Sequence, residues 1–269
     1  MAGLLIPVSR TMRASMRTLF IAGHSDSGGG FLPAGVHPWP ERTRQWLSEV
    51  TGEDWHIVEV RFAPIGSRAT DYLLGKVAAA SPDLLVLPFS AYVCTVGSVE
   101  ESVRARFGER PARWFRSVER PFQEKTAQGG PVSRRTNRTS RVVARKVLGA
   151  RAMATVEQTA AIYEEVLHRL ARIESLQVAA ITDARFSTAI QEWEPKLHER
   201  FDALYARLLP VVDAHRFLKA DLEGKLQEAP DRAVFYHPDG VHTTVAFHEV
   251  YFEVMKEVLG PVYAPRGAM

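Results

Sequence analysis

Short apolar runs alternate along the chain with longer segments of helical periodicity, and this alternation restricts the folds that the chain can adopt. The clearest run is Leu84-Leu85-Val86-Leu87, which follows Pro82-Asp83 and is typical of a strand buried on both faces. We expect four more strands, at residues 18–22, 57–62, 178–181 and 211–213.

Helical spacing of apolar residues fills most of the stretches between these strands. We expect helices near residues 42–47 and over residues 156–173, 194–209 and 247–258. Strands separated by helices of ten or more residues favour βαβ units. The sequence therefore predicts a three-layer α/β/α sandwich around a mostly parallel sheet of five strands.

Size and composition agree with one large domain. A chain of 269 residues that is 46% hydrophobic can bury a sizeable core, and no linker-like stretch divides it. We expect an N-terminal extension at residues 1–17 and a single domain over residues 18–269.

The only cysteine, Cys94, lies in apolar sequence, so we expect a buried, inert thiol. The apolar stretch Leu4 to Val8 is too short for a signal-peptide core, and no run is long enough to span a membrane. We therefore expect a cytoplasmic protein that does not associate with membranes.

Positive charge is concentrated in one segment, from Arg104 to Arg151, which we call the basic segment. It holds fourteen Lys and Arg residues but only three Glu, against a net charge of +3 for the whole chain. We expect a surface insertion, and two interpretations stay open: a solvated surface, or a lid for an anionic substrate or partner. No recognition motif accompanies the charge, so we do not expect nucleic-acid binding.

Two short motifs lie at opposite ends of the chain. The first is Gly23-His24-Ser25-Asp26-Ser27-Gly28, directly after the first predicted strand, and the second is Asp239-Gly240-Val241-His242, before the last predicted helix. A serine needs a base to attack a carbonyl, and a carboxylate can hold that base in the right tautomer. We expect Ser25 as nucleophile, His242 as base and Asp239 as the residue that orients His242.

The two motifs resemble those of the SGNH (GDSL-type) hydrolase family, over about residues 18 to 259. Ser25 matches the family nucleophile, although Gly23-His24-Ser25 stands where Gly-Asp-Ser is usual. The glycine of the second family block is matched by Gly66. The resemblance implies a flavodoxin-like fold with ester-hydrolysing activity, and an oxyanion hole in which the backbone N–H groups of Ser25 and Gly66 take part.

The third family block, Gly-x-Asn-Asp, is not matched. Ser90 and Tyr92 stand at the positions of its glycine and asparagine, and the only asparagine in the chain, Asn137, lies in the basic segment. Three explanations stay open. The hydroxyl of Tyr92 or of Thr95 replaces the missing amide, two backbone donors suffice, or the protein hydrolyses little.

Other interpretations of the same residues are weaker. Ser27 could replace Ser25 as nucleophile, and His248 could replace His242 as base, although we expect it on the helix flank. His237, Asp239 and His242 could together hold a metal ion, but no further carboxylate or thiol cluster supports such a site. We expect neither a metal nor another cofactor.

The function that we predict is that of a serine esterase, which hydrolyses an acyl or acetyl ester through an acyl-enzyme on Ser25. The substrate would be a small-molecule ester, anionic if the basic segment steers it. Trp114 and Phe115 could bind its acyl chain, or could simply anchor the basic segment. An acyltransferase with the same acyl-enzyme, or a weakly catalytic protein that binds an acidic ligand or partner, are the alternatives. The oligomeric state is not predicted.

Overall fold

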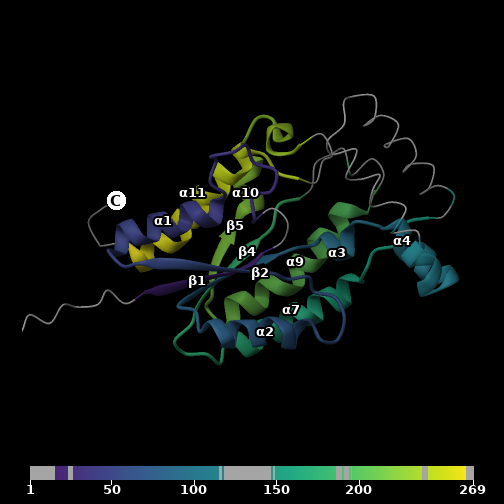
Figure 1. Ribbon diagram of the computed structural model, residues 1–269, viewed down its shortest axis with the longest axis horizontal. Helices are drawn as coiled ribbons and strands as arrows, with labels where there is room; N and C mark the ends of the chain where they lie inside the picture. The colour runs from purple at the N-terminus through teal and green to yellow at the C-terminus, as the bar shows by residue number, and fades with distance from the viewer. Residues whose placement is uncertain are drawn as a thin grey trace, which may run out of the picture.

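A five-stranded parallel sheet forms the centre of the molecule. The computed structural model describes residues 16–23, 27–114, 117, 147, 149–185, 190, 194, 196–237 and 242–264. The strand order is β2-β1-β3-β4-β5, and every neighbouring pair is parallel. The strands are β1 (Arg17–Gly23), β2 (Trp55–Arg61), β3 (Leu84–Phe89), β4 (Gln177–Thr182) and β5 (Leu218–Asp221). Figure 1 shows this sheet between two layers of helices, as predicted.

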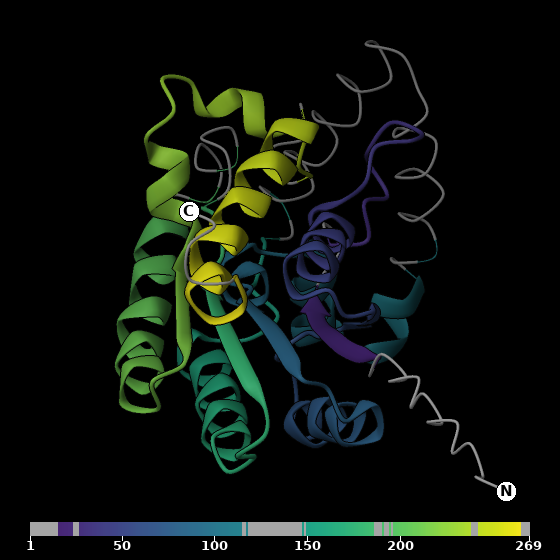
Figure 2. The ribbon, with the colours of Figure 1, turned by 90° about the vertical axis from the view of Figure 1, so that its left-hand side faces the viewer.

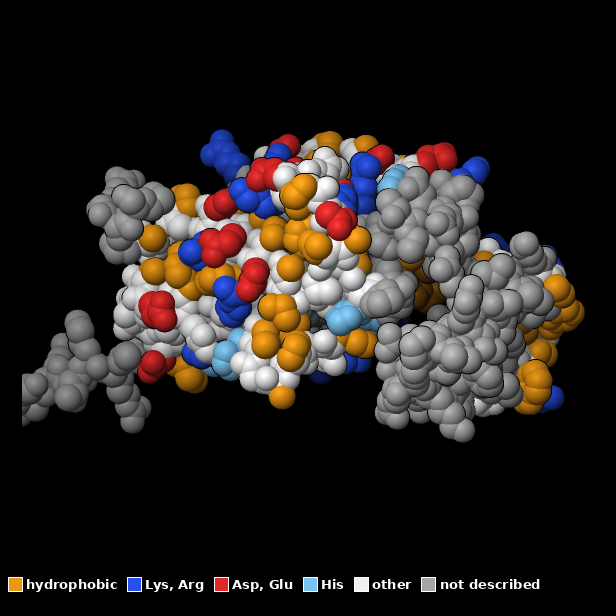
Figure 3. Space-filling model, turned by 90° about the horizontal axis from the view of Figure 1, so that it is seen from above, with side chains coloured by type: hydrophobic (Ala, Val, Ile, Leu, Met, Phe, Trp, Pro, Cys, Tyr) orange, Lys and Arg blue, Asp and Glu red, His pale blue; other side chains and the backbone are white. Residues whose placement is uncertain are grey.

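The helices connect successive strands and cover both faces of the sheet. They are α1 (Trp39–Thr51), α2 (Ala69–Ala80), α3 (Tyr92–Thr95), α4 (Val99–Phe107), α7 (Val156–Leu170), α9 (Leu197–Ala214), α10 (Leu222–Gln227), the 3₁₀ turn η1 (Arg232–Phe235) and α11 (Val245–Tyr263). Helices α1, α10 and α11 lie on one side, and α2, α7 and α9 on the other (Figures 1 and 2). The exposed face of the first layer mixes acidic, basic and hydrophobic side chains (Figure 3).

Two hydrophobic cores hold the layers together, one on each face of the sheet. Alternate residues of the strands point to opposite faces, so Leu85 and Leu87 of β3 join the core beneath α2, α7 and α9, while Leu84 and Val86 join the other core. All six residues of β3 are buried, as the apolar run predicts. Cys94 is also buried, and burial raises the pKa of its thiol, so the group stays protonated.

The prediction of a strand at residues 211–213 is wrong. These residues lie in the last turns of α9, and the edge strand is β5 instead. Leu204, Leu208 and Val212 follow one another at four-residue spacing and are all buried, so helical packing overrides the β-propensity of two adjacent valines. Strand β5 is short, and only Ala220 in it is fully buried, which leaves little apolar pattern to detect.

A bridge joins the end of the basic segment to the residue that precedes α4. Ser98 and Arg151 form an antiparallel bridge, in which each backbone N–H donates to the other residue's carbonyl oxygen, at N···O distances of 2.8 and 3.1 Å. Residues 118–146 lie outside the described residues, and so do residues 1–15 of the predicted extension at residues 1–17. The domain boundaries therefore stay predictions. Among the helices that the structure describes, none has the length and apolarity needed to cross a membrane.

Candidate active site

Strands β1 and β3 separate before they reach the carboxyl edge of the sheet. Their pairing ends at Ile21 and Val86, whereas β1 stays paired with β2 through Gly23, and β3 with β4 through Phe89. Pro88, which has no N–H, lies beyond the β1 pairing and costs the sheet no hydrogen bond to that strand. At this point the order in which the chain adds strands also changes direction: β2 lies on one side of β1, whereas β3, β4 and β5 follow on its other side. Parallel α/β folds bind their ligands at such a point.

The loop after β1 is anchored to the neighbouring strand. The hydroxyl of Ser27 donates to Glu59 Oε1 of β2 at 2.5 Å, and the Ser27 side chain is buried. Glycine is needed at position 23, because a Cβ there would lie 2.1 Å from Ser27 Oγ. Ser27, the alternative nucleophile, therefore has a structural partner on β2, while Ser25 lies outside the described residues.

His242 contacts the same loop. The centroids of the His242 and Phe31 rings are 3.6 Å apart, and Phe31 follows Ser25 by six positions. The loop that carries His242 is closed by a bridge between Tyr236 and Thr243, and the His237 N–H donates to the carbonyl oxygen of His242 at 2.8 Å. The fold thus brings His242 to the segment that leaves β1. Asp239 lies outside the described residues.

A partly buried ion-pair network supports the segment that leads to this loop. The carboxylate of Glu223 is paired with Arg232, and it accepts the backbone N–H of Arg185 at 2.8 Å. The hydroxyl of Tyr236 and Arg232 Nη2 both donate to the carbonyl oxygen of Arg185. These contacts hold the turn η1 against the residues that follow β4. Because η1 precedes the loop that carries His242, they also fix where that loop begins. No local sequence pattern indicates this network, because its members are up to 51 positions apart.

Of the proposed oxyanion-hole residues, Gly66 and Tyr92 are described. Gly66 lies in the loop after β2 with a φ of +77°, a left-handed conformation that glycine tolerates best. Tyr92 is the first residue of α3, and its side chain is 39% exposed. Thr95 is fully buried, and its hydroxyl donates to the carbonyl oxygen of Ala91 at 2.7 Å. Thr95 is therefore engaged within its own helix, and Tyr92 is the side-chain donor that stays a candidate.

Two buried tyrosines hold the carboxyl ends of β3 and β4. Tyr163 of α7 accepts the Ser90 N–H at 2.9 Å. Tyr205 of α9 donates to the carbonyl oxygen of Phe89 at 2.6 Å and accepts the Asp183 N–H at 2.8 Å. Burial raises the pKa of both phenols above their ordinary value, so both hydroxyls stay protonated and can donate. They satisfy backbone groups at strand ends where the ladder hydrogen bonds stop.

Three further predictions concern an acyl-binding pair, a metal site and His248. Trp114 is described and 68% exposed, whereas its neighbour Phe115 lies outside the described residues. The metal alternative at His237, Asp239 and His242 stays untested, because Asp239 lies outside the described residues; among the residues that the structure describes, no group of three His, Cys, Asp or Glu is suited to a metal ion. His248 lies in the first turn of α11 and is buried.

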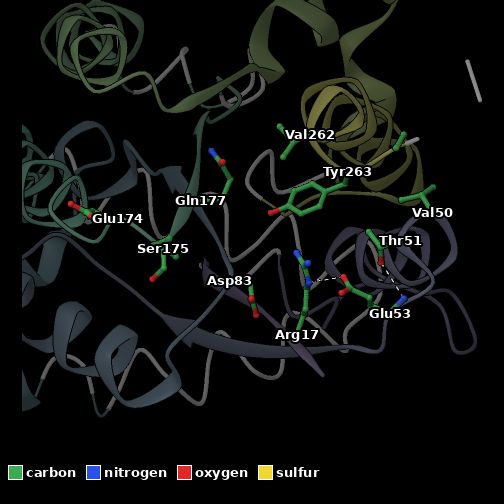
Figure 4. A pocket seen from close by; sticks show the side chains of 12 residues that line it. Arg17, Val50, Thr51, Glu53, Asp83, Glu174, Ser175, Gln177, Val262 and Tyr263 are labelled. Atoms are coloured by element: carbon green, nitrogen blue, oxygen red, sulfur yellow. Dashed lines mark hydrogen bonds and ion pairs between the residues drawn. The ribbon is translucent and has the colours of Figure 1, made fainter. Parts of the chain in front are cut away.

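A cavity of about 670 Å³ lies at the opposite, amino edge of the sheet (Figure 4). It lies where β1, β3 and β4 begin and where α1 and α11 end, with Arg17, Glu53, Asp83 and Tyr263 in its lining. Arg17 and Glu53 form an ion pair at 2.5 Å, which Figure 4 draws as a dashed line. This cavity is at the other end of the strands from His242 and is not part of the candidate active site.

Comparison with solved structures identifies the architecture. A lipase/acylhydrolase from Enterococcus faecalis superimposes with a TM-score of 0.54 at 15% sequence identity, over 94% of this chain and 100% of that chain. Axe2, an acetylxylan esterase from Geobacillus stearothermophilus, matches with a TM-score of 0.53 at 11% identity, over 94% of this chain and 98% of its own. The chain adopts the SGNH-hydrolase fold. No family model matches the sequence, and no curated protein matches it.

The prediction that Tyr92 donates to the oxyanion can be tested by substitution. We expect Tyr92→Phe to lower kcat by about tenfold or more, because loss of one oxyanion donor typically costs about 10²–10³ and backbone donors would remain. KM and the unfolding midpoint should stay near their wild-type values, since the exposed ring is retained. Hydrolysis of p-nitrophenyl acetate measures the change. A wild-type rate in this variant would remove Tyr92 from the oxyanion hole.

Proposed function

We propose that this protein is a serine hydrolase that cleaves esters through an acyl-enzyme on Ser25, with His242 as general base and Asp239 orienting it. The observation that carries the proposal is the contact of the His242 ring with Phe31, in the loop that begins with the predicted nucleophile. The loop after β1 and the loop before α11, more than 200 positions apart in the sequence, are thus in contact, and this contact supports the proposal.

The proposed reaction proceeds in two stages. His242 takes the hydroxyl proton of Ser25 while the serine oxygen adds to the ester carbonyl carbon, and the resulting oxyanion is received by the N–H groups of Ser25 and Gly66 and by the Tyr92 hydroxyl. The intermediate collapses, and the alcohol leaves with the proton from His242. Water, which gives its proton to the same histidine, then adds to the acyl carbon; the bond to Ser25 Oγ breaks, His242 returns the proton to that oxygen, and the acid leaves.

The names of the similar structures agree with an ester as substrate. One is called a lipase/acylhydrolase and another an acetylxylan esterase. Sequence identities of 11–15% carry no information on the acyl group, so we propose only the class: a small-molecule carboxylic ester. The proposal that the basic segment favours an anionic ester rests on its charge alone.

Reaction with a serine-directed fluorophosphonate tests the proposal. We expect the wild-type protein to be labelled on Ser25 and Ser25→Ala to lose all labelling. Ser27→Ala is the matched control: it should keep labelling while losing about 1 kcal/mol of unfolding free energy, because the hydrogen bond to Glu59 is lost.

The outcomes separate the alternatives. Labelling that persists in Ser25→Ala but disappears in Ser27→Ala would move the nucleophile to Ser27. Absence of labelling in the wild-type protein would contradict a serine hydrolase. Labelling of Ser25 without turnover of simple esters would instead favour transfer of the acyl group to an acceptor other than water.

A further inference from the structure

His248, in the first turn of α11, bonds to two separate segments of the chain. Its side chain is only 2% exposed. Its Nδ1 lies 3.2 Å from the backbone nitrogen of Trp39, the first residue of α1. Its Nε2 lies 3.4 Å from Oγ1 of Thr243. One imidazole thus joins residues that are more than 200 positions apart in the sequence.

These contacts define the tautomer of the ring. A backbone N–H can only donate, so Nδ1 of His248 must carry a lone pair directed at Trp39. The proton of the neutral ring is then on Nε2, where it can be donated to the hydroxyl oxygen of Thr243. His248 is therefore a neutral bridge with one acceptor and one donor in use. It is unsuited to the alternative role of general base.

Both segments that His248 joins belong to the proposed active site. Trp39 ends the loop that leaves β1 and that includes Ser27 and Phe31, and Thr243 directly follows His242. We infer that His248 is a positioning residue, which holds the loop that carries His242 at a fixed distance from the loop that leaves β1. This inference rests on the proposed function.

Packing between α1 and α11 does not supply the same restraint. The rings of Trp39 and Tyr251 stack with centroids 4.1 Å apart, which fixes the distance between the helices. The two loops, however, lie beyond the helix starts, and a stacked pair does not set their direction. Hydrogen bonds to a backbone N–H and to Thr243 act where the loops join the helices. A displacement of about 1 Å at such a point can lower turnover by about 10²-fold.

The test compares three substitutions on α11. His248→Phe keeps an aromatic ring but removes both hydrogen bonds, and we expect kcat to fall by about 10- to 100-fold with KM changed less than about threefold. His248→Gln offers an amide oxygen to Trp39 and an amide N–H to Thr243, and should return kcat to within about threefold of wild type. Val254→Ala, a buried position on the same helix, is the control for destabilisation: it should lower the unfolding midpoint and leave kcat unchanged.

Each outcome decides one question. If fluorophosphonate does not label Ser25 in the wild-type protein, the proposed function and this inference both fail. If Ser25 is labelled but His248→Phe turns over at the wild-type rate, only the inference fails. A loss in the Phe variant that Gln does not restore would assign His248 to packing. If His248→Phe does not fold, Thr243→Val replaces it, and a wild-type kcat in that variant overturns the inference.

Discussion

Replacement of His242 by alanine is expected to lower kcat for a p-nitrophenyl ester by at least about 10⁴-fold, because Ser25 would lose the base that takes its proton. KM should change little, since the imidazole acts in the transition state more than in substrate binding. Stopped-flow or long-incubation assays of the purified variant would measure the residual rate. Its unfolding transition should stay close to that of the wild type, because the histidine lies in a loop.

The control for this variant is His168→Ala, which removes a histidine from the opposite layer of the molecule. His168 lies on α7, where its Nδ1 is 2.8 Å from Nε2 of His215. This substitution should leave kcat unchanged. If His242→Ala retains more than about 1% of the wild-type turnover, His242 is not the general base and the proposed mechanism is wrong.

Tyr205→Phe is expected to lower the unfolding free energy by about 2–4 kcal/mol. The substitution removes one hydroxyl but leaves two buried groups without their partner, the carbonyl of Phe89 and the N–H of Asp183. Urea unfolding followed by circular dichroism measures the change. Tyr72→Phe, on an exposed position of α2, is the matched control and should change the unfolding free energy by less than about 0.5 kcal/mol. Equal effects in the two variants would show that the Tyr205 hydrogen bonds contribute nothing net.

The same tyrosine predicts how stability depends on alkaline pH. Burial raises the pKa of Tyr205 in the folded protein, whereas a tyrosine in the unfolded chain ionises near pH 10. The stabilisation is therefore fully present below about pH 10 and is lost as the pH rises, because the unfolded state releases its proton first. Tyr205→Phe should make this decline shallower by up to about 1.4 kcal/mol per pH unit, and an unchanged slope would contradict the assignment.

The sequence predicts local features of this fold better than the contacts between distant segments. The run at residues 84–87 predicts β3 correctly, because a strand covered on both faces needs apolar residues at every position. The segment at residues 211–213 misleads, because its valines belong to a helical stripe that only the position of α9 against the sheet makes visible. Propensity has little weight where tertiary packing decides.

For the candidate site too, local sequence patterns indicate some features, whereas others depend on contacts between distant segments. Strand ends and glycine turns indicate which segments carry the chemistry, and the structure brings His242 to the loop after β1. The roles of Tyr205 and His248 depend on partners 116 and 209 positions away, so no local pattern could reveal them. The triad of Ser25, His242 and Asp239 stays a prediction that labelling and kinetics can test.

The bridge between Ser98 and Arg151 has a consequence for how the length of the basic segment can vary. Because the bridge joins Ser98 to Arg151, the entropic cost of bringing these two residues together depends only logarithmically on the number of residues between them. Halving or doubling the number of residues between the two ends would change that closure term by only about 0.6 kcal/mol. Residues could therefore be inserted or deleted here at small cost. Among homologous sequences, variation in length should concentrate between the positions of Ser98 and Arg151.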